Sequence, residues 1–207
     1  TAPAPREAAP QRLLVARDGA VQSNIRYGRP AVPASDPDYI PLTVANTILG
    51  GGFTSRITQD IREDKGYSYS PWSRFSANRV GGSTLASVDV RNEVTGATLA
   101  ELAKLYDGMA SQPASAEELT GAKRLVGGIY LLRPPLPKKL PDPLANYWVD
   151  GLPPSFLGSY VAESNKVTTE QVQAMGRKYF AAKDQSIVVV GDAKAIDAQL
   201  KPYGTFT

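Results

Sequence analysis

The stretch Leu49–Tyr69, which reads LGGGFTSRITQDIREDKGYSY, decides how the rest of the chain is interpreted. It opens with three glycines and continues into a predicted short amphipathic helix that carries Arg62 at its polar end. Gly66 suits the left-handed residue that closes a helix, and an aromatic strand with Tyr67 and Tyr69 is expected to follow. The stretch therefore predicts a helix, a reversal and a strand that bring Arg62 close to a tyrosine.

The sequence on either side alternates between strand and helix patterns. Two capping boxes, Ser115-x-x-Glu118 and Thr168-x-x-Gln171, predict helix starts. Other helices are expected from Ser35, after a cap at Asn92, and over 193–200; strands are expected within 12–32, at 67–77 and 83–90 as a hairpin, and at 186–190. This order predicts an α+β fold: a two-layer sandwich with helices on one face of a mostly antiparallel or mixed sheet.

One domain is predicted over residues 12–204. Residues 1–11 are rich in alanine and proline and read as an interdomain linker, and 205–207 as a tail. The segment 133–143 contains five prolines, which indicates an irregular or polyproline excursion. A rigid connector is favoured there over a PxxP ligand.

Composition excludes several classes of function. The chain has 23 Lys and Arg against 20 Asp and Glu, and the net charge of +3 is too small to indicate a nucleic-acid partner. No apolar run approaches the roughly 20 residues of a membrane span. The chain has no His and no Cys, so a zinc site built by this chain alone is not expected, and Ser-His-Asp or Cys-His catalysis is excluded.

The glycines Gly50, Gly51 and Gly52 admit three interpretations. Glycines before a helix N-terminus can cradle a phosphate, but no Gly-Lys-Ser/Thr follows here, and the run comes after a predicted helix instead of a strand. The run can instead let the chain reverse between two helices, or form a mobile wall beside a cleft. The last two interpretations are compatible.

A guanidinium and a phenol offer hydrogen-bond donors in fixed positions. Such a pair suits holding a peptide carbonyl or an oxyanion better than removing a proton. Strand alternation places Tyr67 and Tyr69 on the same face, so pattern alone does not decide which of them would accompany Arg62.

The run LGGGFTSRITQDIREDKGYSYS resembles the second half of insulinase-type (M16) zinc peptidases. The likeness extends over most of 12–204 and includes Gln22-x-x-Ile25, GLPPSF at 151–156, VTTEQVQ at 167–173 and VVVGD at 188–192. In that family two homologous domains enclose the substrate, and one of them binds zinc through an inverted His-x-x-Glu-His motif. The other contributes an Arg and a Tyr in an R-x6-Y spacing, which here corresponds to Arg62 and Tyr69.

The resemblance implies a noncatalytic partner domain, because this chain has no inverted zinc motif. The expected function is the substrate-binding half of a zinc-dependent peptidase, with zinc and the catalytic residues supplied by a homologous domain, fused upstream or separate. No catalytic residue and no metal ligand is expected in this chain. A catalytically inert binding or assembly scaffold of the same fold is the alternative, and a bacterial extracytoplasmic location is weakly favoured.

Overall fold

The computed structural model describes residues 9–132 and 141–207. Its strands form one five-stranded sheet in the order β1-β5-β2-β4-β3. The strands are β1 (Arg12–Ala16), β2 (Gln22–Ala31), β3 (Trp72–Ala77), β4 (Gly82–Arg91) and β5 (Ser186–Gly191). Four of the five lie in antiparallel pairs, and β1 runs parallel to β5. The expected mixed sheet is confirmed.

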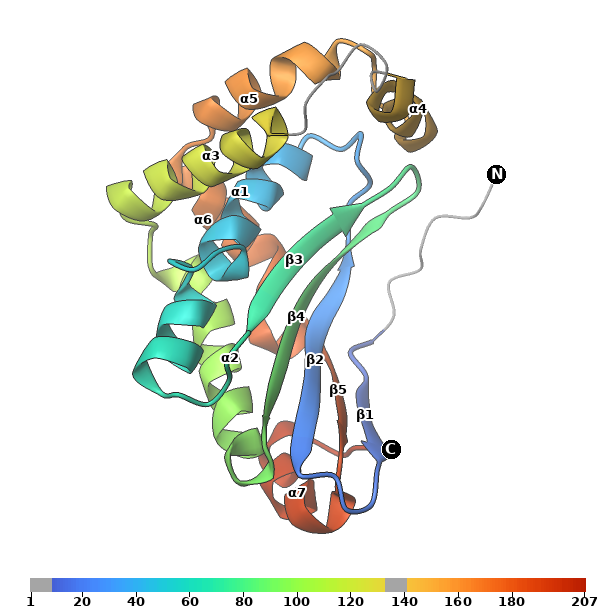
Figure 1. Ribbon diagram of the computed structural model, residues 1–207, viewed down its shortest axis with the longest axis vertical. Helices are drawn as coiled ribbons and strands as arrows, with labels where there is room; N and C mark the ends of the chain where they lie inside the picture. Colours follow the sequence, from blue (N-terminus) through green and yellow to red (C-terminus); the bar gives the residue numbers. More distant parts are fainter. Residues whose placement is uncertain (1–8, 133–140) are drawn as a thin grey trace.

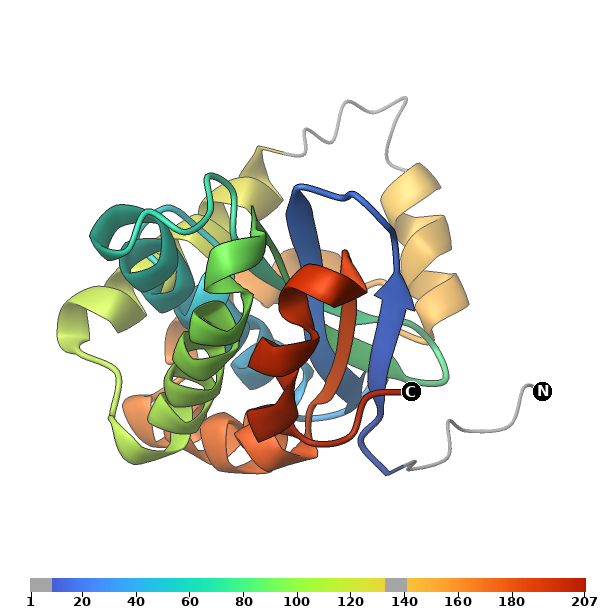
Figure 2. The same ribbon diagram turned by 90° about the horizontal axis from the view of Figure 1, so that it is seen from below.

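Helices cover one face of this sheet, as Figures 1 and 2 show. Helix α2 packs along α6, and α1 packs against α3, α6 and strand β3. Helix α4 lies at one end of this layer, where the Tyr147 hydroxyl is 2.8 Å from that of Tyr130 on α3. It also lies beyond the turn of the β3–β4 hairpin, where Arg79 donates a hydrogen bond to the Trp148 carbonyl. The helices are α1 (Tyr39–Gly50), α2 (Thr95–Ser111), α3 (Ala116–Leu131), α4 (Pro141–Asp150), α5 (Phe156–Lys166), α6 (Thr169–Tyr179) and α7 (Ala193–Leu200). None of the described helices is long and apolar enough to cross a bilayer.

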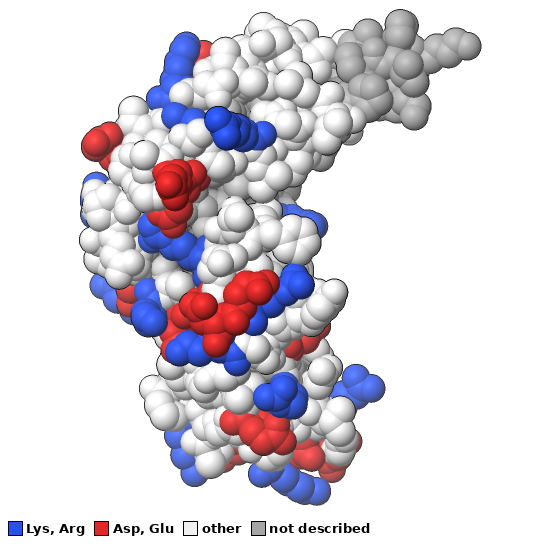
Figure 3. Space-filling model, turned by 60° about the vertical axis from the view of Figure 1, so that its left-hand side comes forward, with Lys and Arg blue, Asp and Glu red and all other residues white. Residues whose placement is uncertain are grey.

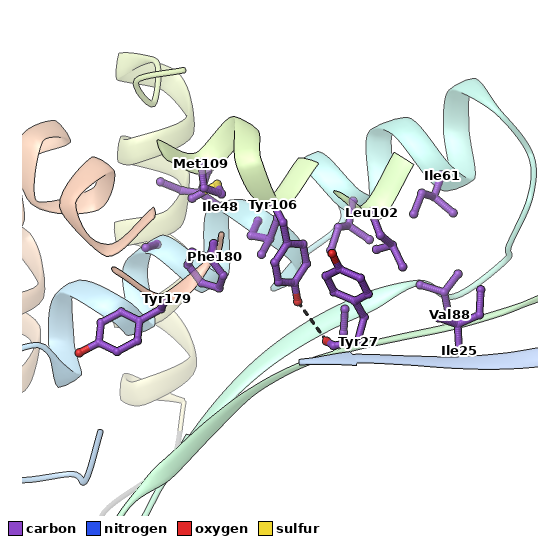
Figure 4. Close-up of a cluster of buried hydrophobic side chains, with 14 of the residues drawn as sticks. Ile25, Tyr27, Ile48, Ile61, Val88, Leu102, Tyr106, Met109, Tyr179 and Phe180 are labelled. Carbon is purple, nitrogen blue, oxygen red and sulfur yellow. Dashed lines mark hydrogen bonds between the residues drawn. The ribbon is translucent and has the colours of Figure 1, made fainter. Parts of the chain in front are cut away.

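The core between the sheet and the helices is built around two buried tyrosines (Figure 4). The rings of Tyr27 on β2 and Tyr106 on α2 meet edge to face with their centroids 4.7 Å apart, and Phe180 meets Tyr106 edge to face at 5.5 Å. The Tyr106 hydroxyl donates to the Tyr27 carbonyl at 3.3 Å, so its polar atom is satisfied inside the core. Burial raises the pKa of Tyr106 well above its usual value.

Local capping chemistry agrees with most of the predicted helix starts. Both capping boxes form as predicted: Ser115 with Glu118, and Thr168 with Gln171. Asn92 does not cap α2, because its side chain instead bonds the Ser23 hydroxyl and the Ala20 carbonyl. That prediction was wrong because a short 3₁₀ turn, residues 92–94, precedes the helix.

Two element boundaries and one helix type in the first half of the chain also differ from the prediction. Helix α1 begins at Tyr39, since the residues after Ser35 form turns. The short helix after the glycines is a π-helix, η1 (Thr58–Asp64), and strand β3 begins only at Trp72. Pro71 explains the late start, because proline has no N–H to donate to the neighbouring strand. Pairing with β4 therefore begins only after Pro71, and Tyr69 lies outside the strand.

The C-terminal residues pair with the sheet, whereas much of the predicted linker and of the proline-rich segment lies outside the described residues. Residues 1–8 of the predicted linker and 133–140 of the predicted excursion lie outside the described residues, and 141–143 open helix α4. The predicted tail is bound to the sheet: Leu14 N–H donates to the Thr207 carbonyl, and Thr207 N–H donates to the Arg12 carbonyl. These bonds add the chain end to the free edge of β1.

Replacing Gly176 by alanine tests the packing of α6 on α2. A Cβ at Gly176 would lie 2.1 Å from the Met109 carbonyl oxygen, so the helices must separate, and we expect Gly176→Ala to lower the free energy of unfolding by about 1–3 kcal/mol. The matched control is Gly121→Ala on α3, where nothing lies within 4 Å of an added Cβ, and the better helix propensity of alanine is expected to add up to about 1 kcal/mol. Denaturant unfolding measures both, and equal stabilities would contradict this packing.

Candidate functional site

A hollow of about 240 Å³ lies where the glycine run, the π-helix and the start of β3 meet, and we call it the glycine hollow. Its lining comes from three parts of one continuous stretch of chain. The glycines run from the last residue of α1 into the loop before η1, Thr58 and Arg62 belong to η1, and Tyr69 and Trp72 lie before and at the start of β3. The lining residues are Gly50, Gly51, Gly52, Phe53, Thr58, Arg62, Tyr69, Ser70, Pro71 and Trp72. All five predicted site residues therefore lie together.

The glycines are required for close contact and not for unusual backbone angles. None of the three has a positive φ. A Cβ at Gly50 would lie 2.5 Å from the backbone nitrogen of Ser73 on β3, and one at Gly51 would lie 2.7 Å from the Thr47 Cα. The run thus lets the end of α1 press against β3 while the chain reverses. Gly51 N–H already donates to the Thr47 carbonyl, which removes one amide that a phosphate cradle would need.

Side chains of the π-helix hold the loop that follows the glycines. The Thr58 hydroxyl donates to the Gly52 carbonyl at 3.1 Å, and the Gln59 amide donates to the Phe53 carbonyl at 2.9 Å. Ser55 N–H also donates to the Gly52 carbonyl. These bonds fix the backbone of Phe53, which carries its ring into solvent at 78% exposure.

The end of the π-helix separates the two candidate tyrosines. Gly66 takes the left-handed conformation with φ of 61°, and Tyr67 N–H returns to the Ile61 carbonyl at 2.9 Å. Tyr67 then packs against the core, whereas Tyr69 is 80% exposed. Of the two tyrosines that the sequence pattern left open, Tyr69 therefore lies in the hollow with Arg62.

The Arg62 guanidinium lies over two aromatic rings. Its central carbon is 4.7 Å from the centroid of Tyr69 and 5.5 Å from that of Phe53, and its Nε lies 3.2 Å from a Glu63 carboxylate oxygen. Within the described residues its two terminal nitrogens have no hydrogen-bond acceptor. Ring contacts at these distances orient a guanidinium while its N–H groups stay available in the plane. The arrangement presents a fork of donors to a carbonyl or carboxylate oxygen.

An ion pair ties the start of this stretch to the helical layer. The Arg56 guanidinium makes two contacts with the Glu118 carboxylate, at 2.7 and 3.0 Å, and Arg56 also reaches the Gly108 and Gln112 carbonyls at the end of α2. Hydrogen bonds from Arg56 hold the pKa of Glu118 below its ordinary value, against the opposing effect of burial. One carboxylate therefore serves both the capping box of α3 and the anchor of the loop.

Charges of both signs surround this region. Lys65 and Lys104 both pair with Glu101 on α2, next to the π-helix. Figure 3, which brings the left-hand side of Figure 1 forward, shows acidic and basic side chains intermixed over the surface it presents.

Zinc does not fit the donors that this chain offers. The sequence has no His and no Cys, and the described residues contain no group of three or more His, Cys, Asp or Glu side chains that could hold a metal. Zinc sites are built from such groups. The glycine hollow can hold a ligand by hydrogen bonds and ring contacts, but it supplies no metal and no side chain suited to act as a base.

Sequence reasoning missed the aromatic residues Phe53 and Trp72, which line the hollow, and Arg56, which anchors it. The contact between Arg56 and Glu118 joins residues 62 positions apart, and nothing in the sequence pairs them.

Known proteins share the sequence pattern and the fold of this chain. The family model described as "Peptidase M16 inactive domain" matches residues 2–126. A crystal structure of a peptidase M16 inactive domain from Pseudomonas fluorescens has a TM-score of 0.83 and 25% identity, over 91% of this chain and 45% of that one. The inactive peptidase domain of a Bordetella parapertussis protein has the same fold, with a TM-score of 0.72 at 16% identity over 84% of this chain and 94% of that one.

Curated relatives carry differing descriptions. A Bacillus subtilis protein named "uncharacterized zinc protease YmxG" is 29% identical over 72% of this chain and 36% of the relative. A Helicobacter pylori protein named "non-peptidase homolog YmxG" is 22% identical over 84% of this chain and 40% of the relative. The chain therefore spans well under half the length of these relatives.

The pH dependence of stability tests the Arg56–Glu118 anchor. Because the folded-state pKa of Glu118 is lowered, its contribution is complete above the unfolded-state value and disappears as the pH falls through the folded-state value. We expect Glu118→Gln to cost about 1.5–3 kcal/mol of unfolding free energy at pH 7, and much less at pH 3. Glu163→Gln, which removes an exposed ion pair with Lys166, is the control and should cost no more than about 0.5 kcal/mol. A Glu118→Gln cost that is independent of pH would contradict the ionic anchor.

Proposed function

This chain belongs to the peptidase M16 inactive-domain family, and we propose that it is the substrate-binding, noncatalytic half of a zinc-dependent M16 peptidase. In this proposal Arg62 and Tyr69 bind the peptide backbone in the glycine hollow. The observation that carries it is the donor fork of Arg62, which has no acceptor among the described residues and lies over the exposed Tyr69 ring at 4.7 Å in the glycine hollow.

The geometry suits a peptide backbone for two reasons. The guanidinium offers several N–H groups to a carbonyl oxygen, and such bonds strengthen when that oxygen gains negative charge during hydrolysis. The Tyr69 hydroxyl, on a side chain that is 80% exposed, can add a further hydrogen bond.

The proposal assigns the bond-breaking chemistry elsewhere. Zinc, when bound by a homologous His-x-x-Glu-His domain, would supply the activated water and polarise the scissile carbonyl. This chain's residues would hold and orient the peptide, which lowers the entropic barrier to the reaction. The partner domain would be fused upstream or carried on a separate subunit.

The second candidate is a scaffold of the same fold that binds a partner or peptide without cleavage. A relative at 22% identity is named a non-peptidase homolog, and this chain lacks zinc ligands of its own. We favour the peptidase half because both members of the R-x6-Y spacing, Arg62 and Tyr69, are present and lie in one hollow.

The test is activity in the assembled complex with the zinc-binding domain. We expect chelator-sensitive cleavage of oligopeptides that zinc restores, and no cleavage by this chain alone. Arg62→Ala is expected to lower kcat by roughly 10²–10³-fold, comparable to the loss of one oxyanion donor. Tyr69→Phe, which keeps the ring over Arg62 and removes only the hydroxyl, should have a smaller effect in the same direction.

Matched variants separate binding roles from general damage. Arg91→Ala removes an arginine whose side chain is 63% exposed outside the hollow, and Tyr67→Phe removes the hydroxyl of the tyrosine that packs on the core. Both should retain activity, and size-exclusion chromatography confirms that each complex assembles. Full activity of both Arg62→Ala and Tyr69→Phe in an assembled complex would refute the assigned roles. An assembled complex with no chelator-sensitive cleavage would favour the scaffold.

A further inference from the structure

Three exposed aromatic side chains line the glycine hollow, and we call them the aromatic cluster: Phe53, Tyr69 and Trp72. They are 78%, 80% and 36% exposed, respectively. Exposed apolar surface gathered beside a hollow, in contrast to single exposed residues, marks binding sites. Backbone binding by Arg62 and Tyr69 leaves Phe53 and Trp72 without a role.

The size of the hollow limits what can bind there. Its volume of about 240 Å³ is below the roughly 300–1,000 Å³ of pockets that enclose drug-sized ligands. It therefore has room for about one large side chain and the adjoining peptide unit. A folded partner or a large cofactor does not fit this space.

The charges around the rings select the kind of side chain. Arg62 lies over Phe53 and Tyr69, and Arg74 lies over Trp72 with its central carbon 5.1 Å from the ring centroid. Two guanidinium groups already occupy ring faces, so a Lys or Arg side chain would meet like charge, and Glu63 offsets only part of it. An aromatic or aliphatic side chain has no such penalty and gains ring contacts.

The backbone that carries the cluster is held before a ligand arrives. The Phe53 carbonyl accepts from Gln59, and Trp72 is the first residue of β3, paired in register with Ser87 on β4. Because the backbone at both positions is already ordered, binding a side chain there costs no further backbone entropy.

We propose that Phe53 and Trp72 form a subsite that accepts one aromatic or aliphatic side chain of the peptide and disfavours a basic one. The proposal rests on the proposed function, since it assigns specificity to the peptide that Arg62 and Tyr69 hold. The side-chain preference would then be set by Phe53, directly after the glycine run, and by Trp72, the first residue of β3. Both residues belong to the noncatalytic chain.

Tryptophan fluorescence of the full chain tests this subsite. The chain has two tryptophans, and Trp148 is 77% exposed on α4, so Trp148→Phe leaves Trp72 as the sole reporter. Capped peptides acetyl-Ala-Xaa-Ala-amide, with Xaa as Phe, Leu, Ala or Lys, are titrated into this background. We expect the Phe peptide to bind about tenfold tighter than the Ala peptide, Leu to be intermediate, and Lys to be no tighter than Ala.

Three further variants in that background separate the two proposals. Phe53→Ala should weaken the Phe peptide to within about twofold of the Ala peptide while the Ala peptide is unaffected. Arg62→Ala should weaken all four peptides alike, and Val21→Ala, at a side chain 81% exposed in the turn before β2, should change none.

Each outcome decides between the proposals. An unchanged preference for Phe after Phe53→Ala, or a Lys peptide that binds as tightly as the Phe peptide, overturns the subsite; uniform weakening by Arg62→Ala then still supports the proposed function. Equal binding by the Arg62→Ala variant, or no binding of any peptide, overturns the backbone-binding role and the subsite with it.

Discussion

The close approach of helix α1 to strand β3 is the constraint on which the site depends. The Asn46 amide donates to the Ser73 carbonyl at 3.0 Å and the Ser73 hydroxyl returns a bond to the Asn46 side-chain oxygen at 2.7 Å, with both side chains buried. One turn later Gly50 lies against the same strand residue, with no space for a Cβ. Because α1 ends in contact with β3, the chain must reverse at the edge of the sheet, and the glycine hollow forms in that reversal. The Arg56–Glu118 pair then fixes the other side of the loop to α3.

In the proposed function this site holds a peptide and leaves the bond cleavage to another domain. The Gly52 and Phe53 carbonyls accept from Thr58 and Gln59, while the terminal nitrogens of Arg62, which lines the hollow, have no acceptor among the described residues. With no His and no Cys in the chain, the residues that remain can position a peptide and stabilise charge upon it. The family's description as an inactive domain agrees with this reading of the side chains.

Sequence reasoning predicted the fold class, both capping boxes and the proximity of Arg62 to a tyrosine, because each depends on short-range patterns. It did not predict that the helix of Arg62 is a π-helix, since one extra residue per turn leaves the apolar spacing of Ile57 and Ile61 nearly unchanged. The misassigned cap at Asn92 and the missed Arg56–Glu118 pair share a cause: the partners of these side chains lie more than 60 positions away. Tertiary contacts of that kind have no periodic signature.

The most direct measurement is a structure of this chain assembled with its zinc-binding counterpart and an uncleavable peptide. The account predicts the peptide backbone in the glycine hollow, with a terminal nitrogen of Arg62 about 2.7–3.2 Å from a peptide carbonyl oxygen. It also predicts the metal on the opposing domain. A peptide bound away from the hollow, with Arg62 making no contact to it, would contradict the account.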